Sequence, residues 1–232
     1  MKKILAITLV AMVAATSVQA DAISINWTEF TGAVNLVADG SGVEPANNWN
    51  DTTGTTWNDQ ILSSGAASTI DIAATAPGGM DSFGFALQNY SRLRAGIVVY
   101  ATPATVTLSD INATFATYDV IVYVTGFNGV GNQSATTVGG VTYYATVPNP
   151  YTTVLTQSTD TNIGDGADDG TYVRFNGLTA DSTTITMASV TGAGVGIGGI
   201  QVVGTVIPEP ATLGLLGAFG GGILFIRRKF KI

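Results

Sequence analysis

The side chains best suited to chemistry are oxygen donors in one short, glycine-rich acidic segment. Residues 160–170 read DTNIGDGADDG, and carboxylate or amide oxygens recur along them. Calcium takes about six to eight oxygen ligands in flexible geometry, so this composition suits a calcium site. The EF-hand pattern fails, because the segment lacks glycine at position six and glutamate at position twelve. The alternative is a solvated acidic loop between two strands. The candidate calcium ligands are Asp160, Asn162, Asp165, Asp168 and Asp169.

A second candidate site surrounds a tryptophan. Residues 47–51 read NNWND, so amides and a carboxylate flank Trp49. Sugars stack on exposed aromatic faces while amides and carboxylates bind their hydroxyls, which makes Asn48, Trp49 and Asn50 candidate carbohydrate contacts. In the alternative, Trp49 fills the end of the domain and its neighbours satisfy the amides of a loop.

The common catalytic devices are excluded by composition. The chain has no histidine and no cysteine, so Ser-His-Asp triads, Cys-His pairs and the usual zinc sites are impossible. Carboxylates alone can hydrolyse a glycosidic bond. However, Glu29 and Glu44 are the only glutamates between the two chain ends, and most aspartates lie at turn positions. We therefore expect no enzyme and no cofactor other than calcium, and a carboxylate-only glycoside hydrolase is the least favoured alternative.

The charge balance limits the partners. Residues 21–206 contain three arginines against fifteen carboxylates, a formal charge of −12. Nucleic acid is not an expected partner, because binding its phosphate backbone needs clustered Lys and Arg. The acidity also opposes direct binding of an acidic polysaccharide unless divalent cations bridge the two.

The elements that must position these residues are short β-strands. Runs of β-branched or aromatic residues recur between Gly, Asn, Asp and Pro, and helical periodicity is nearly absent. Residues 118–124 are apolar at almost every position, as in a strand covered on both faces, whereas residues 183–187 alternate. Gly139 and Gly140 separate two such runs and predict a hairpin. We predict an all-β, jelly-roll-type β-sandwich. The expected strands are residues 23–27, 33–37, 69–73, 83–87, 96–100, 104–108, 118–125, 141–147, 172–175, 183–187 and 200–203.

The N-terminus predicts export. Lys2 and Lys3 precede the apolar residues 4–15, and Val18-Gln19-Ala20 suits a signal peptidase. Residues 1–20 are therefore expected to be a signal peptide, in helical form, that is cleaved after Ala20.

The C-terminus has three parts. Pro208, Glu209 and Pro210 form a stiff elbow, residues 211–226 are apolar and predict a short transmembrane helix, and residues 227–232 are basic. This basic tail places the chain end on the cytoplasmic side. Its basic residues are Arg227, Arg228, Lys229 and Lys231. The expected organisation is a signal peptide (1–20), a β-sandwich domain (21–206) and a sorting signal (207–232).

This C-terminal arrangement resembles the PEP-CTERM proteins of Gram-negative bacteria, whose C-terminal signal is recognised by the membrane enzyme exosortase. The resemblance covers residues 207–232 and rests on Pro208, Glu209 and Pro210 before the apolar run and the basic end. It implies an inner-membrane intermediate, processing near the motif, and delivery to the cell surface or an exopolysaccharide matrix. Exosortase and signal peptidase are the partners that it implies during maturation.

The middle of the chain also resembles a domain found in many PEP-CTERM proteins. The resembling stretches are residues 42–50, 118–123, 172–178 and 199–203. Such domains look like galactose-binding-type jelly rolls, and the resemblance implies no activity. We expect a non-enzymatic surface or matrix protein with a structural or adhesive role and exopolysaccharide as a candidate partner. A carbohydrate-binding module is the alternative.

Overall fold

The computed structural model describes the part of the chain between the two predicted sorting signals. The described residues are 20–27, 40–52, 54–82, 95–126, 131–148, 154–191 and 194–207. They belong to one compact unit, Ala20–Ile207. Residues 1–19 of the predicted signal peptide and the whole of residues 208–232, with the predicted transmembrane helix, lie outside the described residues. Among the described residues, no helix has the length and apolar character needed to cross a membrane.

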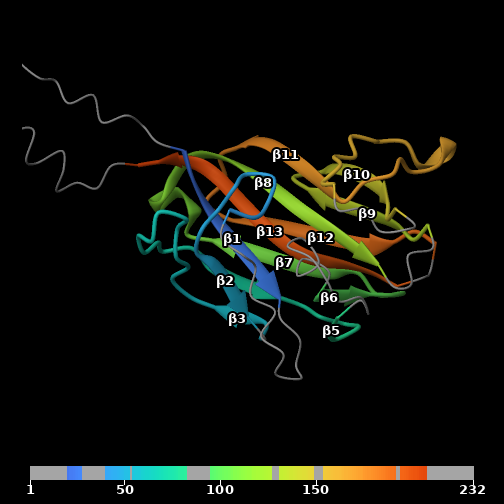
Figure 1. The fold of residues 1–232 in the computed structure, drawn as a ribbon, viewed down its shortest axis with the longest axis horizontal. Helices are drawn as coiled ribbons and strands as arrows, with labels where there is room; N and C mark the ends of the chain where they lie inside the picture. Colours follow the sequence, from blue (N-terminus) through green and yellow to red (C-terminus); the bar gives the residue numbers. More distant parts are fainter. Residues whose placement is uncertain are drawn as a thin grey trace, which may run out of the picture. The chain divides into compact units, whose positions relative to one another are not determined.

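Two β-sheets form this unit, which confirms the predicted all-β sandwich (Figure 1). One sheet has seven strands in the order β11-β8-β13-β1-β2, with β6 also paired to β13 and β5 paired to β6. The other has six strands in the order β10-β9-β12-β7-β4-β3. The strands of the first sheet are β1 (Ala20–Trp27), β2 (Trp49–Thr52), β5 (Met80–Ser82), β6 (Ala95–Val99), β8 (Phe115–Gly126), β11 (Tyr172–Leu178) and β13 (Val195–Val206). Those of the second are β3 (Thr56–Trp57), β4 (Asp71–Ala74), β7 (Ala104–Ser109), β9 (Gln133–Val138), β10 (Val141–Thr146) and β12 (Thr183–Ser189). Among the described residues, the short 3-10 helices η2 (Ile111–Ala113) and η4 (Ile163–Asp165) lie in connections.

Most of the expected strands coincide with strands of the structure. The expected strands at 33–37 and 83–87 lie outside the described residues. The predicted hairpin is confirmed, since β9 and β10 pair across a turn in which Gly139 and Gly140 have φ of 57° and 83°. Two consecutive residues with positive φ match the twist of paired strands, and glycine adopts this conformation without a steric penalty.

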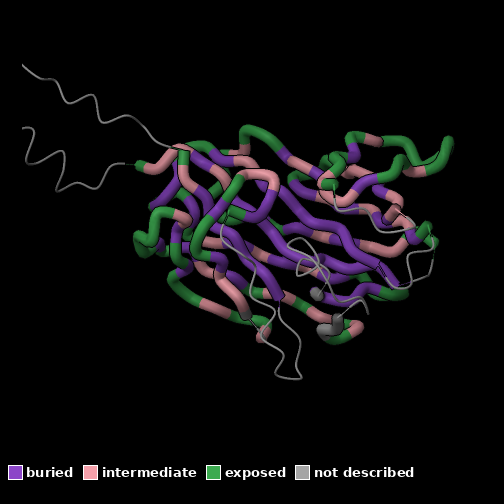
Figure 2. Tube along the Cα trace, viewed as in Figure 1, coloured by how far each residue is buried: buried purple, intermediate pink, exposed green. Residues whose placement is uncertain are grey.

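Residues 120–126 of β8 are buried on both faces, as the continuous apolar sequence around them predicted (Figure 2). Val120 and Val122 alternate with Ile121 and Tyr123, because successive side chains of a strand point to opposite faces. The two valines belong to the main core between the sheets. Ile121 and Tyr123 belong to a second cluster on the outer face of the seven-stranded sheet. Because these two side chains are buried, another part of the chain must cover that outer face.

Tyr118 of β8 makes the stability of the fold sensitive to alkaline pH. Its buried hydroxyl donates to the Ala180 carbonyl oxygen at 2.7 Å and accepts from the Thr183 hydroxyl. Burial raises the pKa of Tyr118 above 10.0; the hydrogen bond to Thr183 opposes this rise, and the nearby Asp181 carboxylate adds to it. The folded state thus holds this proton more tightly than the unfolded chain. The resulting stability is complete below pH 10 and is lost as the pH rises through the folded pKa.

We expect Tyr118→Phe to flatten the alkaline fall of the free energy of unfolding, with a loss of about 1 kcal/mol near neutral pH from the missing hydrogen bonds. Urea unfolding between about pH 7 and 11.5 measures both effects. An alkaline fall as steep in Tyr118→Phe as in the parent protein would show that another group is responsible.

Candidate functional site

A loop covers the outer face of the seven-stranded sheet. We name residues 40–48 the cover loop. It closes on itself, since the Gly40 N–H donates to the Ala46 carbonyl oxygen at 2.9 Å and the Ala46 N–H donates to the Ser41 carbonyl oxygen at 3.1 Å. The loop leads directly into β2, which pairs in parallel with β1. Its contacts with the sheet involve an amide, an arginine and a set of aromatic rings.

The amide belongs to Gln201 of β13, which is fully buried. Its Nε2 donates to the Ser24 hydroxyl at 2.9 Å and to the Glu44 carbonyl oxygen at 2.8 Å. Its Oε1 accepts from the Glu44 N–H at 3.3 Å and from the Tyr123 hydroxyl. The same hydroxyl accepts from the Val43 N–H at 2.6 Å. Because an amide side chain has two donor hydrogens and two acceptor positions, Gln201 is fully satisfied by the loop and its own sheet.

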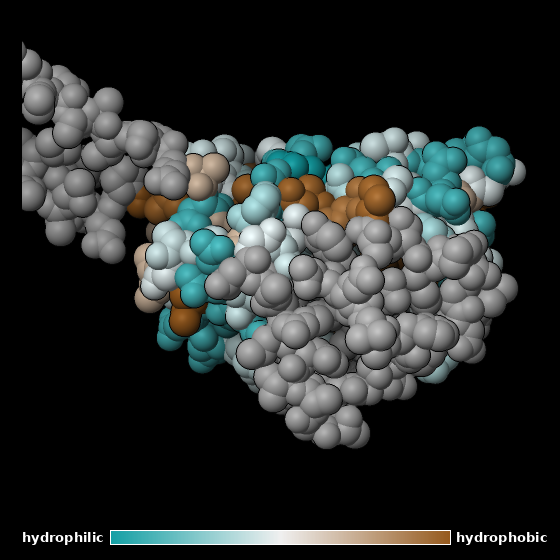
Figure 3. All heavy atoms as spheres, viewed as in Figure 1, coloured by the Kyte–Doolittle hydropathy of each residue, from teal (hydrophilic) through white to brown (hydrophobic). Residues whose placement is uncertain are grey.

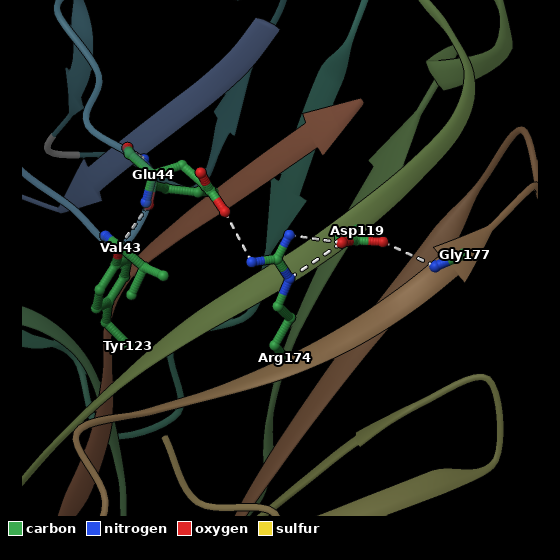
Figure 4. A network of polar contacts seen from close by, with 7 residues as sticks. Val43, Glu44, Asp119, Tyr123, Arg174 and Gly177 are labelled. Carbon is green, nitrogen blue, oxygen red and sulfur yellow. Dashed lines mark hydrogen bonds and ion pairs between the residues drawn. The ribbon is translucent and has the colours of Figure 1, made fainter. Parts of the chain in front are cut away.

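The arginine is Arg174 of β11, which lies between two carboxylates (Figure 4). Its Nη1 is 2.7 Å from Glu44 Oε1, and its Nε and Nη2 are 3.0 and 2.7 Å from Asp119 Oδ2. The other oxygen of Asp119 accepts from the Gly177 N–H at 2.8 Å, beside the irregularity where the register of β11 and β8 shifts. The guanidinium therefore connects the cover loop to β11 and β8.

The electrostatics of this group favour a clamp over an acid–base pair. Partial burial lowers the pKa of Arg174, but hydrogen bonds to Asp119 and Glu44 outweigh it and raise the pKa overall. The charged guanidinium bonds to Glu44 and Asp119 at once, so it holds the two carboxylates in place. A glycosidase instead needs a carboxyl group that faces the leaving group and gives it a proton.

Aromatic rings form the third contact. The ring centroids of Trp49 and Tyr123 are 6.2 Å apart, and those of Tyr123 and Tyr172 are 6.3 Å apart. Trp49 exposes only 9% of its surface and Tyr123 only 1%. Ala46 and Ile121 complete the buried cluster. On the side drawn in Figure 3, the described surface is largely hydrophilic with small hydrophobic patches. The rings are thus packing residues of a covered face, not an open stacking platform.

The candidate carbohydrate contacts on either side of Trp49 bond to the backbone. Asn48 Nδ2 donates to the Ser63 carbonyl oxygen at 3.0 Å. Asn50 accepts from the Ile61 N–H at 2.9 Å and donates to the Ile61 carbonyl oxygen at 2.9 Å and the Ser24 carbonyl oxygen at 3.1 Å. These bonds favour the alternative in which Trp49 fills space and its neighbours satisfy a loop. Carbohydrate contact at these residues stays a prediction.

The acidic segment lies along the edge of β10. The Tyr144 N–H donates to the Asp160 carbonyl oxygen at 2.9 Å, and the Thr146 N–H donates to the Asp168 carbonyl oxygen at 2.8 Å. Asp160 Oδ1 accepts from the Asn162 N–H, and Asn162 Oδ1 accepts from the Gly164 N–H.

These bonds favour an acidic loop that protects a strand edge. The side chains of Asp165, Asp168 and Asp169 are exposed. Within the described ranges, no group of three or more carboxylates gathers as a metal site would require. Calcium binding by this segment stays a prediction.

Sequence reasoning named Glu44 only as one of two core glutamates in the argument against a glycosidase. It missed the roles of Arg174, Asp119, Tyr123 and Gln201. One signal was present. Gln201 is the single strongly polar residue in the apolar run GIGGIQVVG of residues 196–204. A buried amide needs hydrogen-bond partners, so such a residue predicts a polar contact from outside its own strand.

Comparisons with known proteins add little to this geometry. No family model matches the chain, and no curated protein matches it. Among solved structures, a ruminal GH26 endo-beta-1,4-mannanase is similar over 48% of this chain and 19% of its own chain. The identity is 16% and the TM-score is 0.27. A similarity of this size supports neither a fold family nor a function.

Proposed function

We propose that this chain is an exported, exosortase-sorted β-sandwich with a structural or adhesive role at the cell surface or in the exopolysaccharide matrix of a Gram-negative bacterium. The observation that carries the proposal is the C-terminal succession of Pro208-Glu209-Pro210, an apolar run and a basic tail, together with the signal-like N-terminus. Signal peptidase and exosortase are its partners during maturation, and exopolysaccharide is a candidate partner afterwards.

The strand pairing supports the proposal that both ends are processed. Ala20 pairs with Thr205, and Asp21 pairs with Gly204, in the antiparallel ladder of β1 and β13. The first and last strands are therefore neighbours, and Ala20 and Thr205, which precede the two predicted cleavage points, pair with each other. Cleavage after Ala20 and near Pro208 would leave the ladder that joins the ends almost intact.

The same pairing supports a finer description of the fold. The N-terminal and C-terminal strands lie side by side within one sheet of a two-sheet sandwich, an arrangement that we take as a jelly roll of the galactose-binding type.

The covered outer face supports a non-enzymatic role. The polar groups of Arg174 and Gln201 are used by the cover loop, and the nearby rings of Trp49 and Tyr123 are buried.

The test is cell fractionation of a variant in which Pro208, Glu209 and Pro210 are replaced by alanine. We expect the unprocessed chain to accumulate in the membrane fraction, because the sorting enzyme no longer reads its motif. Pro103→Ala is the control, since this proline lies in an exposed connection of the domain. If the triple variant were processed and released like Pro103→Ala, the sorting proposal would be wrong.

A further inference from the structure

The outer face of the six-stranded sheet is free of charge across four neighbouring strands. Strands β10, β9, β12 and β7 contain no Asp, Glu, Lys or Arg. Residues 21–206 as a whole carry a formal charge of −12. Asp71 of β4 borders the uncharged area, and its carboxylate accepts a hydrogen bond from the Asp59 N–H at 3.1 Å. Within the part of the chain that the structure describes, no strand or helix lies over this face.

Threonines occupy this face in register. They alternate with core residues such as Val106 and Ile185, so their side chains point away from the core. One row joins Thr142, Thr137, Thr186 and Thr105, and a second row joins Thr184, Thr107, Ala73 and Thr56. We name this set the threonine face. Each of its side chains is exposed or half-buried.

Several hydroxyls of the threonine face are hydrogen-bonded in pairs. The Thr107 and Thr184 oxygens are 3.1 Å apart, and the Thr137 and Thr142 oxygens are 2.8 Å apart. Thr105 is bonded in the same way to Thr75 at 3.0 Å. A hydroxyl that already has a partner loses less when water is removed than an unpaired one. The face can therefore be buried at a low desolvation cost, and its methyl groups gain from burial.

The charge distribution of the domain favours one kind of partner for the threonine face. Two copies of a strongly acidic domain repel each other in most orientations, and this repulsion is weakest where neutral faces meet. A sugar ligand, in contrast, needs free donors, and each of these hydroxyl pairs uses one of its two donor hydrogens internally. We propose that the threonine face binds the same face of a second copy of this chain, with the two sheets stacked about a two-fold axis.

The size of the face sets the expected strength. Four strands are six or seven residues long, at about 3.4 Å per residue, and the shorter β4 and β3 continue the sheet at a strand spacing of about 4.8 Å. The face therefore measures at most roughly 24 by 20 Å, and two such faces bury at most roughly 1,000 Å², which is near the lower limit for a specific interface. We therefore expect a concentration-dependent dimer with a dissociation constant of about 1–100 µM.

Sedimentation velocity of the full chain in detergent, over about 1–100 µM, tests the dimer. Thr107→Lys and the exposed Thr184→Lys place a charge in the middle of the face. Each is expected to weaken association at least about tenfold, because like charges then meet across the two-fold axis. Thr159→Lys carries the same change on an exposed residue of another loop and is expected to associate like the parent protein. Unchanged thermal midpoints show that the variants fold.

Two results would overturn the inference. One is a parent protein that stays monomeric over the whole range, including a monomer that binds polysaccharide or another partner through this face. The other is a dimer that Thr107→Lys and Thr184→Lys weaken no more than Thr159→Lys. Neither result touches the sorting proposal, which fractionation of the Pro208-Glu209-Pro210 variant tests separately.

Discussion

Trp49→Ala is expected to lower the free energy of unfolding by about 3 kcal/mol, near the lower end of the range for removing a large buried aromatic side chain. The indole packs against Tyr123 and Ala46 and exposes only 9% of its surface. Its removal leaves a cavity under the cover loop that the Gln201 and Arg174 contacts prevent from closing. Urea unfolding measures the loss. Val141→Ala, which shortens a side chain with 48% exposure, is the control and is expected to cost less than about 0.5 kcal/mol.

The result also separates the two interpretations of Trp49. If Trp49 is a packing residue, its truncation lowers the stability of the protein whether or not a ligand is present. If Trp49 is a carbohydrate contact, the Trp49→Ala protein loses binding on a glycan array and keeps its stability. Parental stability combined with lost glycan binding would therefore contradict the covered-face account and favour a carbohydrate-binding module.

Gly42→Ala is expected to cost about 2–4 kcal/mol and to release the cover loop from β13. A Cβ at this position would lie 2.7 Å from Gln201 Oε1 and 2.8 Å from Gln201 Nε2. The amide cannot withdraw without breaking its bonds to Glu44 and Ser24. The φ of +105° adds strain for any residue with a side chain. Thermal or urea unfolding measures the total.

Gly40→Ala is the matched control for this change. Gly40 also has a positive φ, +76°, but a Cβ there would meet nothing within 4 Å. It is expected to cost only the backbone strain, about 1–2 kcal/mol. The difference in the free energy of unfolding between Gly42→Ala and Gly40→Ala measures the cost of the contact with Gln201. Equal losses in Gly42→Ala and Gly40→Ala would mean that Gln201 does not hold the loop.

The sequence predicted most of the sheet framework, because strand periodicity is a local property. The hairpin at Gly139-Gly140 and the alternation of residues 183–187 are both present. The prediction for the last strand was too short, since β13 spans Val195–Val206 and residues 200–203 were expected. Its first half is rich in glycine, which has low strand propensity. Pairing with β8 on one edge and with β6 and β1 on the other overrides that propensity.

The covered face could not be predicted in the same way, because its bonds join residues far apart in the chain. Arg174 and Glu44 are 130 residues apart, and Gln201 and Glu44 are 157 residues apart. No periodicity or motif connects such positions. Composition was also ambiguous at Asn50, whose amide suits a sugar hydroxyl or a backbone group equally well. Only the fold shows that it bonds to Ile61 and Ser24.

Intact-mass spectrometry of the protein released from the cell surface tests most directly whether residues 21–206 are an exported domain between two removable sorting segments. We predict a chain that begins at Asp21 and ends near Pro208, without the apolar run and the basic tail. A released, water-soluble protein that still carries Met1 to Ala20 and Ala211 to Ile232 would contradict the account.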